Sequence, residues 1–139
     1  MKVHVVNKNE ESITGYQRVE ISGGIADFQG CSDNECTSIL MTTSLDSVDL
    51  NGVQKLLHQA RQKMRIGGSL VVGGTDIRLL SRAVVSGSLD TQQANEVLYS
   101  KSSCSDVNTV VDLLRSLGLS VISTKVAGIH YEIESVRKA

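Results

Sequence analysis

Four acidic residues lie near or just after the carboxyl ends of predicted β-strands, where a carboxylate can meet a ligand. They are Glu20, Asp27, Asp46 and Asp76. Ligands of open parallel sheets bind beyond the carboxyl ends of the strands, so these side chains are the first candidates for a site. Asp46 has the position of a general base or of a group that orients a substrate hydroxyl. An equally simple role for Asp46 is to cap the helix that begins near Asp49.

A glycine-rich segment, MRIGGSLVVGGTDIRLL at 64–80, invites comparison with phosphate-binding loops. A P-loop needs Lys and then Ser or Thr after its glycines, and the dinucleotide fingerprint needs three glycines between the first strand and helix. Neither arrangement occurs. We therefore interpret Gly67 and Gly68 as the end of a helix and 69–74 as a buried strand. Gly73 permits close approach of a ligand or of neighbouring backbone, and is a candidate for shaping a substrate pocket.

Histidines and cysteines predict no further site. His4, His58 and His130 fall inside predicted elements rather than at strand-to-helix junctions, so structural or surface roles are expected. No Ser-His-Asp, Cys-His or paired-carboxylate arrangement can be assembled from neighbouring residues. Cys31 and Cys36 lack a second ligand pair at zinc-site spacing, so we expect reduced thiols and no metal.

The elements that must position these residues alternate along the chain. Apolar and β-branched runs predict strands over 2–6, 16–22, 25–28, 37–45, 69–74, 119–126 and 129–136. Apolar residues at helical spacing predict helices over 48–64, 75–85, 89–100 and 105–118. This order predicts an α/β fold, a Rossmann-like three-layer sandwich. Its twisted sheet is expected to be mostly parallel, with an antiparallel C-terminal hairpin.

Composition narrows the class of protein. The chain has 139 residues, which fits one domain over 1–139. Hydrophobic residues make up 40% and charged residues 21%, as in ordinary soluble proteins. A net charge of -1 without a basic run disfavours a nucleic-acid partner. No apolar run is long enough to span a membrane and no export signal begins the sequence, so we expect a cytoplasmic protein.

In this order and at these junctions, the sequence resembles the short class I S-adenosylmethionine-dependent methyltransferases. That family has a Gly-aromatic-x-x-Val-Asp-Ile segment, then Ala-Asp-Leu and an Asp-Asn-Ser loop. This chain has GYQRVEI at 15–21, ADF at 26–28 and SDNE at 32–35 in the same order. ILMTTSLDSV at 39–48 and MRIGGSLVVGGTD at 64–76 then stand where the family has strands ending in Ser-His-Val-Leu-Glu-His and near Pro-Asp. The resemblance covers nearly the full chain.

The resemblance implies S-adenosylmethionine as cofactor and, in an active enzyme, methyl transfer to an O or N acceptor that the sequence does not identify. It implies that Glu20 takes the ribose-binding position and that Asp27 and Phe28 flank the adenine. The other implied site residues are Ile21 and Thr43 for the cofactor, Asp46 for catalysis, and Ser44, Gly73 and Asp76 for the substrate.

A second hypothesis rests on the turn after the first strand. Where the family has Gly-x-Gly, this chain has Val6, Asn7 and Lys8, whose Cβ atoms would crowd the methionine part of the cofactor. The missing glycines favour a catalytically inactive module that keeps the fold for binding or assembly with another protein. A homodimer through an edge strand or the terminal hairpin is a third hypothesis.

Overall fold

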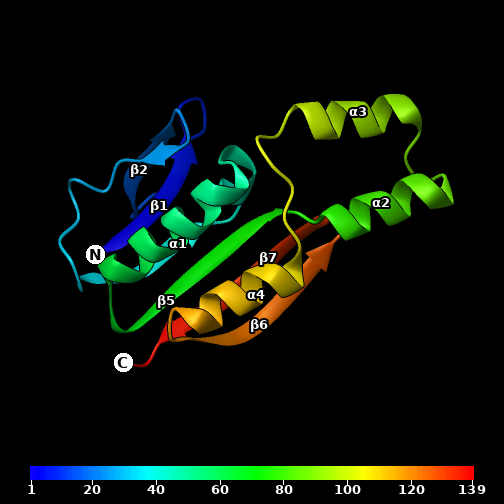
Figure 1. Ribbon diagram of the computed structural model, residues 1–139. Helices are drawn as coiled ribbons and strands as arrows, with labels where there is room; N and C mark the ends of the chain where they lie inside the picture. The colour runs from blue at the N-terminus through cyan, green and yellow to red at the C-terminus, as the bar shows by residue number, and fades with distance from the viewer.

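The computed structural model describes residues 1–139 and contains one seven-stranded sheet (Figure 1). The strand order is β3-β2-β1-β4-β5-β7-β6. β1, β2, β4 and β5 are parallel, whereas β7 runs antiparallel to both β5 and β6. This confirms the predicted sheet with its antiparallel C-terminal hairpin. The strands are β1 (Lys2–Asn7), β2 (Gln17–Ser22), β3 (Ile25–Ala26), β4 (Cys36–Met41), β5 (Met64–Thr75), β6 (Leu119–Ala127) and β7 (His130–Arg137).

Each of the four α-helices begins at an aspartate. The aspartate carboxylate accepts a hydrogen bond from a backbone N–H of the first turn, which would otherwise lack a partner. The caps at Asp76, Asp90 and Asp106 confirm the predicted helix starts. No helix is long and apolar enough to cross a membrane. The helices are α1 (Leu50–Lys63), α2 (Ile77–Ser86), α3 (Thr91–Tyr99) and α4 (Val107–Ser116), with a 3-10 helix, η1 (Ser44–Ser47), before α1.

The first glycine pair does not end a helix, so this prediction was wrong. Helix α1 ends at Lys63, and the chain enters β5 directly at Met64. Gly67 lies within β5 with a φ of +85°, where the register of β5 against β4 is irregular. A left-handed residue at a strand irregularity favours glycine for the same steric reason as a helix end does, which explains the misassignment.

The core lies between one face of the sheet and helices α1 and α4, which lie side by side on that face (Figure 1). On the opposite face, residues 8–16 return from β1 to the parallel strand β2. In this segment, the backbone N–H of Ile13 donates to Nδ1 of His4 at 3.1 Å. The largest buried core side chains include Ile39, Met41, Leu57, Leu70, Leu114 and Ile133.

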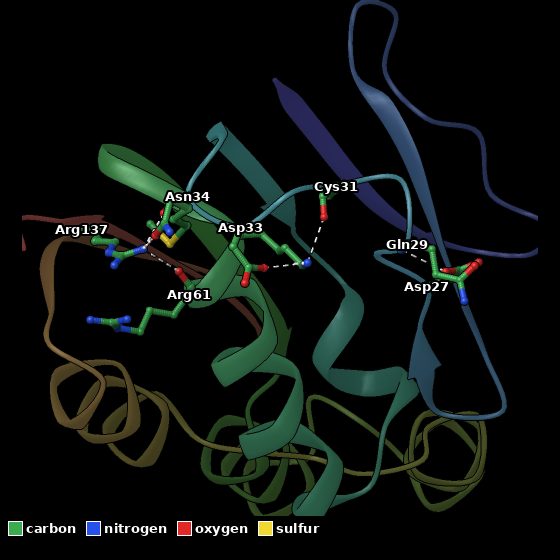
Figure 2. Close-up of polar contacts among 9 residues, drawn as sticks. Asp27, Gln29, Cys31, Asp33, Asn34, Arg61 and Arg137 are labelled. Atoms are coloured by element: carbon green, nitrogen blue, oxygen red, sulfur yellow. Dashed lines mark hydrogen bonds and ion pairs between the residues drawn. The ribbon is translucent and has the colours of Figure 1, made fainter.

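The amino edge of the sheet is held by polar contacts from distant parts of the chain (Figure 2). The Lys63 ammonium, at the end of α1, donates to the Cys31 carbonyl at 2.9 Å. The Arg137 guanidinium, at the end of β7, donates to the Asn34 side-chain oxygen at 2.6 Å. These bonds fix the segment between β3 and β4 against α1 and β7.

Candidate functional site

A polar cleft of about 910 Å³ opens at the carboxyl edge of the sheet. Its walls come from the ends of β1, β4 and β5, from α3 and the segment after it, and from the β6–β7 turn. Only two of its 14 lining residues are hydrophobic, so the cleft suits a polar ligand. Hydroxyl and amide groups dominate the lining, among them those of Asn7, Thr43, Gln93 and Ser100.

Asp46 is the best-connected side chain of the cleft and is only 8% exposed. Its carboxylate accepts hydrogen bonds from the Thr75 backbone N–H at 2.7 Å and from the Thr75 hydroxyl at 2.9 Å. The Lys101 ammonium lies 3.4 Å from the second carboxylate oxygen. These contacts satisfy a buried charge that would otherwise be costly. Asp46 does not cap α1, because Asp49 does, and its catalytic role stays a prediction.

The other residues predicted for the substrate side have different surroundings. Thr43 lines the cleft, whereas Ser44 is buried and its hydroxyl donates to a β1 carbonyl at 3.3 Å. Gly73 lies between two backbones: a Cβ there would be 2.1 Å from the Thr42 carbonyl oxygen and 2.7 Å from that of Tyr131. This glycine therefore admits neighbouring backbone rather than a ligand.

Asp76 joins the starts of two helices. One carboxylate oxygen accepts from the backbone N–H groups of Arg78 and Leu79 in α2, and the other accepts from that of Val107 in α4. Asp76 is 4% exposed and does not line the cleft. Its contacts set the direction in which α2 leaves the sheet and therefore where α3 closes the cleft.

The residues predicted to hold the nucleoside lie outside this cleft, at the carboxyl end of β2. Two of them are brought together there, since the Asp27 backbone N–H donates to the Glu20 carbonyl at 3.0 Å. The Glu20 side chain is 40% exposed and Asp27 is also exposed. Phe28 and Ile21, by contrast, are 4% and 5% exposed and belong to the hydrophobic core. The structure thus places two carboxylates at this position, without an apolar wall beside them.

The Arg18 guanidinium lies beside Glu20 at the same position and bonds β2 to the turn after β1. This residue was not identified from the sequence. Its guanidinium donates to the carbonyls of Asn7 at 3.0 Å, Lys8 at 3.1 Å and Glu10, all in the turn after β1. It also lies 3.5 Å from the Glu20 carboxylate. The available signal was strand alternation, which puts Arg18 and Glu20 on one face of β2.

These observations test the fit of S-adenosylmethionine. The Glu20 carboxylate is paired with Arg18, Phe28 faces the core, and the turn after β1 holds a guanidinium. In this conformation the residues implied by the resemblance do not form a cradle for the nucleoside.

The buried Cys36 thiol and the distribution of metal-ligating side chains point to no second centre. Burial, with a smaller contribution from the neighbouring Cys31 thiol, raises the pKa of Cys36 to about 11, so this thiol is protonated at neutral pH. No group of three or more His, Cys, Asp or Glu side chains is arranged to hold a metal ion. The polar groups at the carboxyl edge of the sheet therefore gather in the cleft and around Arg18.

The structure is similar to solved S-adenosylmethionine-dependent methyltransferases. One from Archaeoglobus fulgidus has 12% identity and a TM-score of 0.63, with 88% of this chain and 68% of that chain covered. A possible histamine N-methyltransferase from Thermotoga maritima has 19% identity and a TM-score of 0.60, with 89% and 65% covered. The 1,6-didemethyltoxoflavin-N1-methyltransferase of Burkholderia thailandensis, which contains S-adenosylhomocysteine, has 11% identity and a TM-score of 0.53, with 78% and 46% covered.

These likenesses confirm the predicted resemblance to class I methyltransferases at the level of the fold. This chain spans about two thirds of the first two structures and less than half of the third. No protein-family model matches the sequence, and no curated protein matches it.

Proposed function

We propose that this chain is a binding or assembly module built on the methyltransferase fold, without methyl transfer of its own. The observation that carries this proposal is the position of Arg18 in the turn after β1, bonded to the carbonyls of Asn7 and Lys8. A guanidinium there takes the space beside the strand end and repels a cofactor that carries a sulfonium cation. The same side chain also pairs with Glu20, the predicted ribose ligand.

The ligand of such a module would occupy the polar cleft. A pocket lined mainly by hydroxyl, amide and charged groups favours a small polar molecule over an apolar one, since polar groups that lose water must regain hydrogen bonds. The same lining is exposed enough to meet a polar segment of a partner protein.

The second candidate function is S-adenosylmethionine-dependent methyl transfer to an O or N acceptor. Two observations favour it: Glu20 and Asp27 lie side by side at the end of β2, and Thr43 and Asp46 lie in the nearby cleft. All three solved structures compared above are dependent on this cofactor or contain its product. This candidate requires Arg18 to leave the turn when the cofactor binds.

Isothermal titration calorimetry of the full chain with S-adenosylmethionine and with S-adenosylhomocysteine separates the two candidates. For the module, we expect no saturable heat with either molecule. Saturable binding that Glu20→Ala weakens, but that Asp112→Ala on the exposed side of α4 leaves unchanged, would overturn the module in favour of the enzyme.

A further inference from the structure

Helices α2 and α3 form an arm, defined here as residues 77–99, that projects beyond the carboxyl edge of the sheet (Figure 1). The helices have 10 and 9 residues, and each fully buries only one of them, Leu80 in α2 and Ala94 in α3. Helices of this length are marginal in water without tertiary packing of an apolar face. The arm therefore lacks most of the packing that short helices need.

Several apolar side chains of the arm face water. Val84 in α2 and Leu98 in α3 are each 42% exposed, while Val85 is 89% and Tyr99 85% exposed. Single exposed apolar residues are normal, but here both helices of one projecting arm show them at equivalent positions. Each exposed pair lies four and five residues after the buried residue of its helix. Val84 and Leu98, at the fourth position, share the face of the buried residue, whereas Val85 and Tyr99, at the fifth, point away from it and are open to a partner.

Charged residues beside these apolar side chains have opposite signs on the two helices. Arg82 precedes Val85 by three residues and Glu96 precedes Tyr99 by three, so each charge neighbours the most exposed apolar side chain of its helix. Both charged residues are exposed, and neither takes part in an ion pair within the chain. Because both lie near the middle of their helices, they can meet when α2 of one molecule packs on α3 of another.

We propose that the arm binds the arm of a second copy of this chain, with α2 of each copy against α3 of the other. A two-fold axis forms both contacts at once, so that Arg82 of each copy pairs with Glu96 of the other. The exposed apolar side chains of α2 and α3 then lie in the centre of the interface. This proposal goes beyond the proposed function and does not rest on it, because it concerns contact with a second copy rather than a ligand of the cleft. Glu96 belongs to both surfaces, since it also lines the cleft.

The sheet edges are poorer sites for such a contact. The edge strand β6 has a register shift against β7 around Ile122, and it carries Lys125. Bulges and lysines on edge strands are features that protect a sheet from pairing with another chain. The opposite edge, β3, has only two residues. The dimer is thus expected through the arm rather than through the edge strand that the sequence suggested.

Sedimentation velocity of the full chain over a wide concentration range tests the proposal. We expect a reversible monomer–dimer equilibrium that Val85→Asp weakens by at least about tenfold in dissociation constant. Ile122→Asp, a control of an exposed apolar residue on the edge strand, should leave the equilibrium unchanged. A wild-type chain that stays monomeric, or a dimer lost only with Ile122→Asp, overturns the arm interface.

A charge exchange identifies which helices meet. Arg82→Glu should weaken the dimer by placing two carboxylates together, and the double variant with Glu96→Arg should restore it. A failure of the double variant to recover overturns the pairing of α2 with α3. Circular dichroism of each variant establishes that the monomer still folds, which is expected because these positions are exposed.

Discussion

Two regions at the carboxyl edge of one sheet differ in how their polar groups are held. At the rim, defined as the ends of β4 and β5 with η1, the Asp46 carboxylate is 8% exposed and is bonded to the backbone and hydroxyl of Thr75. At the corner, defined as the ends of β1 and β2 with the turn between 7 and 10, the Arg18 and Glu20 side chains are 34% and 40% exposed. The rim is fixed by buried bonds, whereas the corner is closed by contacts that water can replace.

This difference matters for function because exposed ion pairs contribute only about 0 to 1 kcal/mol, while hydrogen bonds to a charged group contribute about 1.5 to 3 kcal/mol. The corner is therefore the part of the edge that a ligand can reshape at low cost. The rim should keep its geometry with or without a ligand. Substitutions at the rim should therefore cost more stability than substitutions at the corner.

The largest effect is expected for Gly73→Ala at the rim. The new methyl group would lie 2.1 Å and 2.7 Å from two backbone carbonyl oxygens, so strands β4 and β7 must both move. We expect a loss of about 3 kcal/mol in the free energy of unfolding, measured by urea denaturation. Gly74→Ala is the matched control, since its Cβ would meet side chains rather than backbone: the Asp46 carboxylate at 3.1 Å, the Leu45 side chain at 3.3 Å and the Tyr131 hydroxyl at 3.6 Å. Equal losses for both variants would contradict a rim fixed by its backbone.

Asp46→Ala should have the next largest effect. Without the carboxylate, the buried backbone N–H and hydroxyl of Thr75 lose their acceptor. We expect a loss of about 2 kcal/mol by urea denaturation. Asp27→Ala, an exposed carboxylate near the corner that accepts only the Gln29 N–H, should cost about 0.5 kcal/mol or less. Similar losses for the two aspartates would remove the distinction between rim and corner.

The order of strands and helices could be predicted because its signals are local. Asp90 with Gln93 forms the capping box of α3, and Gly118 follows α4 with a φ of +80°. Both features can be recognised within a few residues of sequence. Gly67 was assigned to a helix end because a left-handed glycine after a basic helical turn fits a helix end as well as a strand irregularity. Only the pairing partner in β4 decides between them.

The candidate site was less predictable because it depends on packing between distant segments. Glu20 lies beside Asp27, and Asp46 lies in the cleft, all at the strand ends that the sequence pointed to, while their roles stay predictions. The core position of Phe28 depends on which side of the segment after β3 faces the helices, and no local pattern sets this. Arg18 was missed for a similar reason: its partners are backbone carbonyls of a loop, which have no sequence signature.

Arg18→Ala tests how much the Arg18 contacts contribute to the stability of the corner. Loss of the contacts to the turn after β1 should lower the free energy of unfolding by only about 1 kcal/mol, because the guanidinium is partly exposed. Amide hydrogen exchange of residues 8–16 should increase clearly, since the loop loses its main tether. Arg115→Ala, which removes an exposed arginine of α4 without an ion pair, is the control for both measurements. Unchanged exchange in the loop would show that other contacts close the corner.

The smallest effect is expected for a substitution of His4, which lies beneath the loop of residues 8–16. Burial is the main cause that lowers its pKa below the usual 6.5, and its Nδ1 must be unprotonated to accept from Ile13. As the pH falls below 6.5, His4 therefore binds a proton more readily in the unfolded chain than in the native one. Its contribution to stability is present at neutral pH and is lost on acidification. His4→Gln should flatten the decline of the free energy of unfolding in that range, whereas His58→Gln, at an exposed position in α1, should not. An identical decline in all three proteins would mean that the loop over the corner does not depend on the uncharged imidazole.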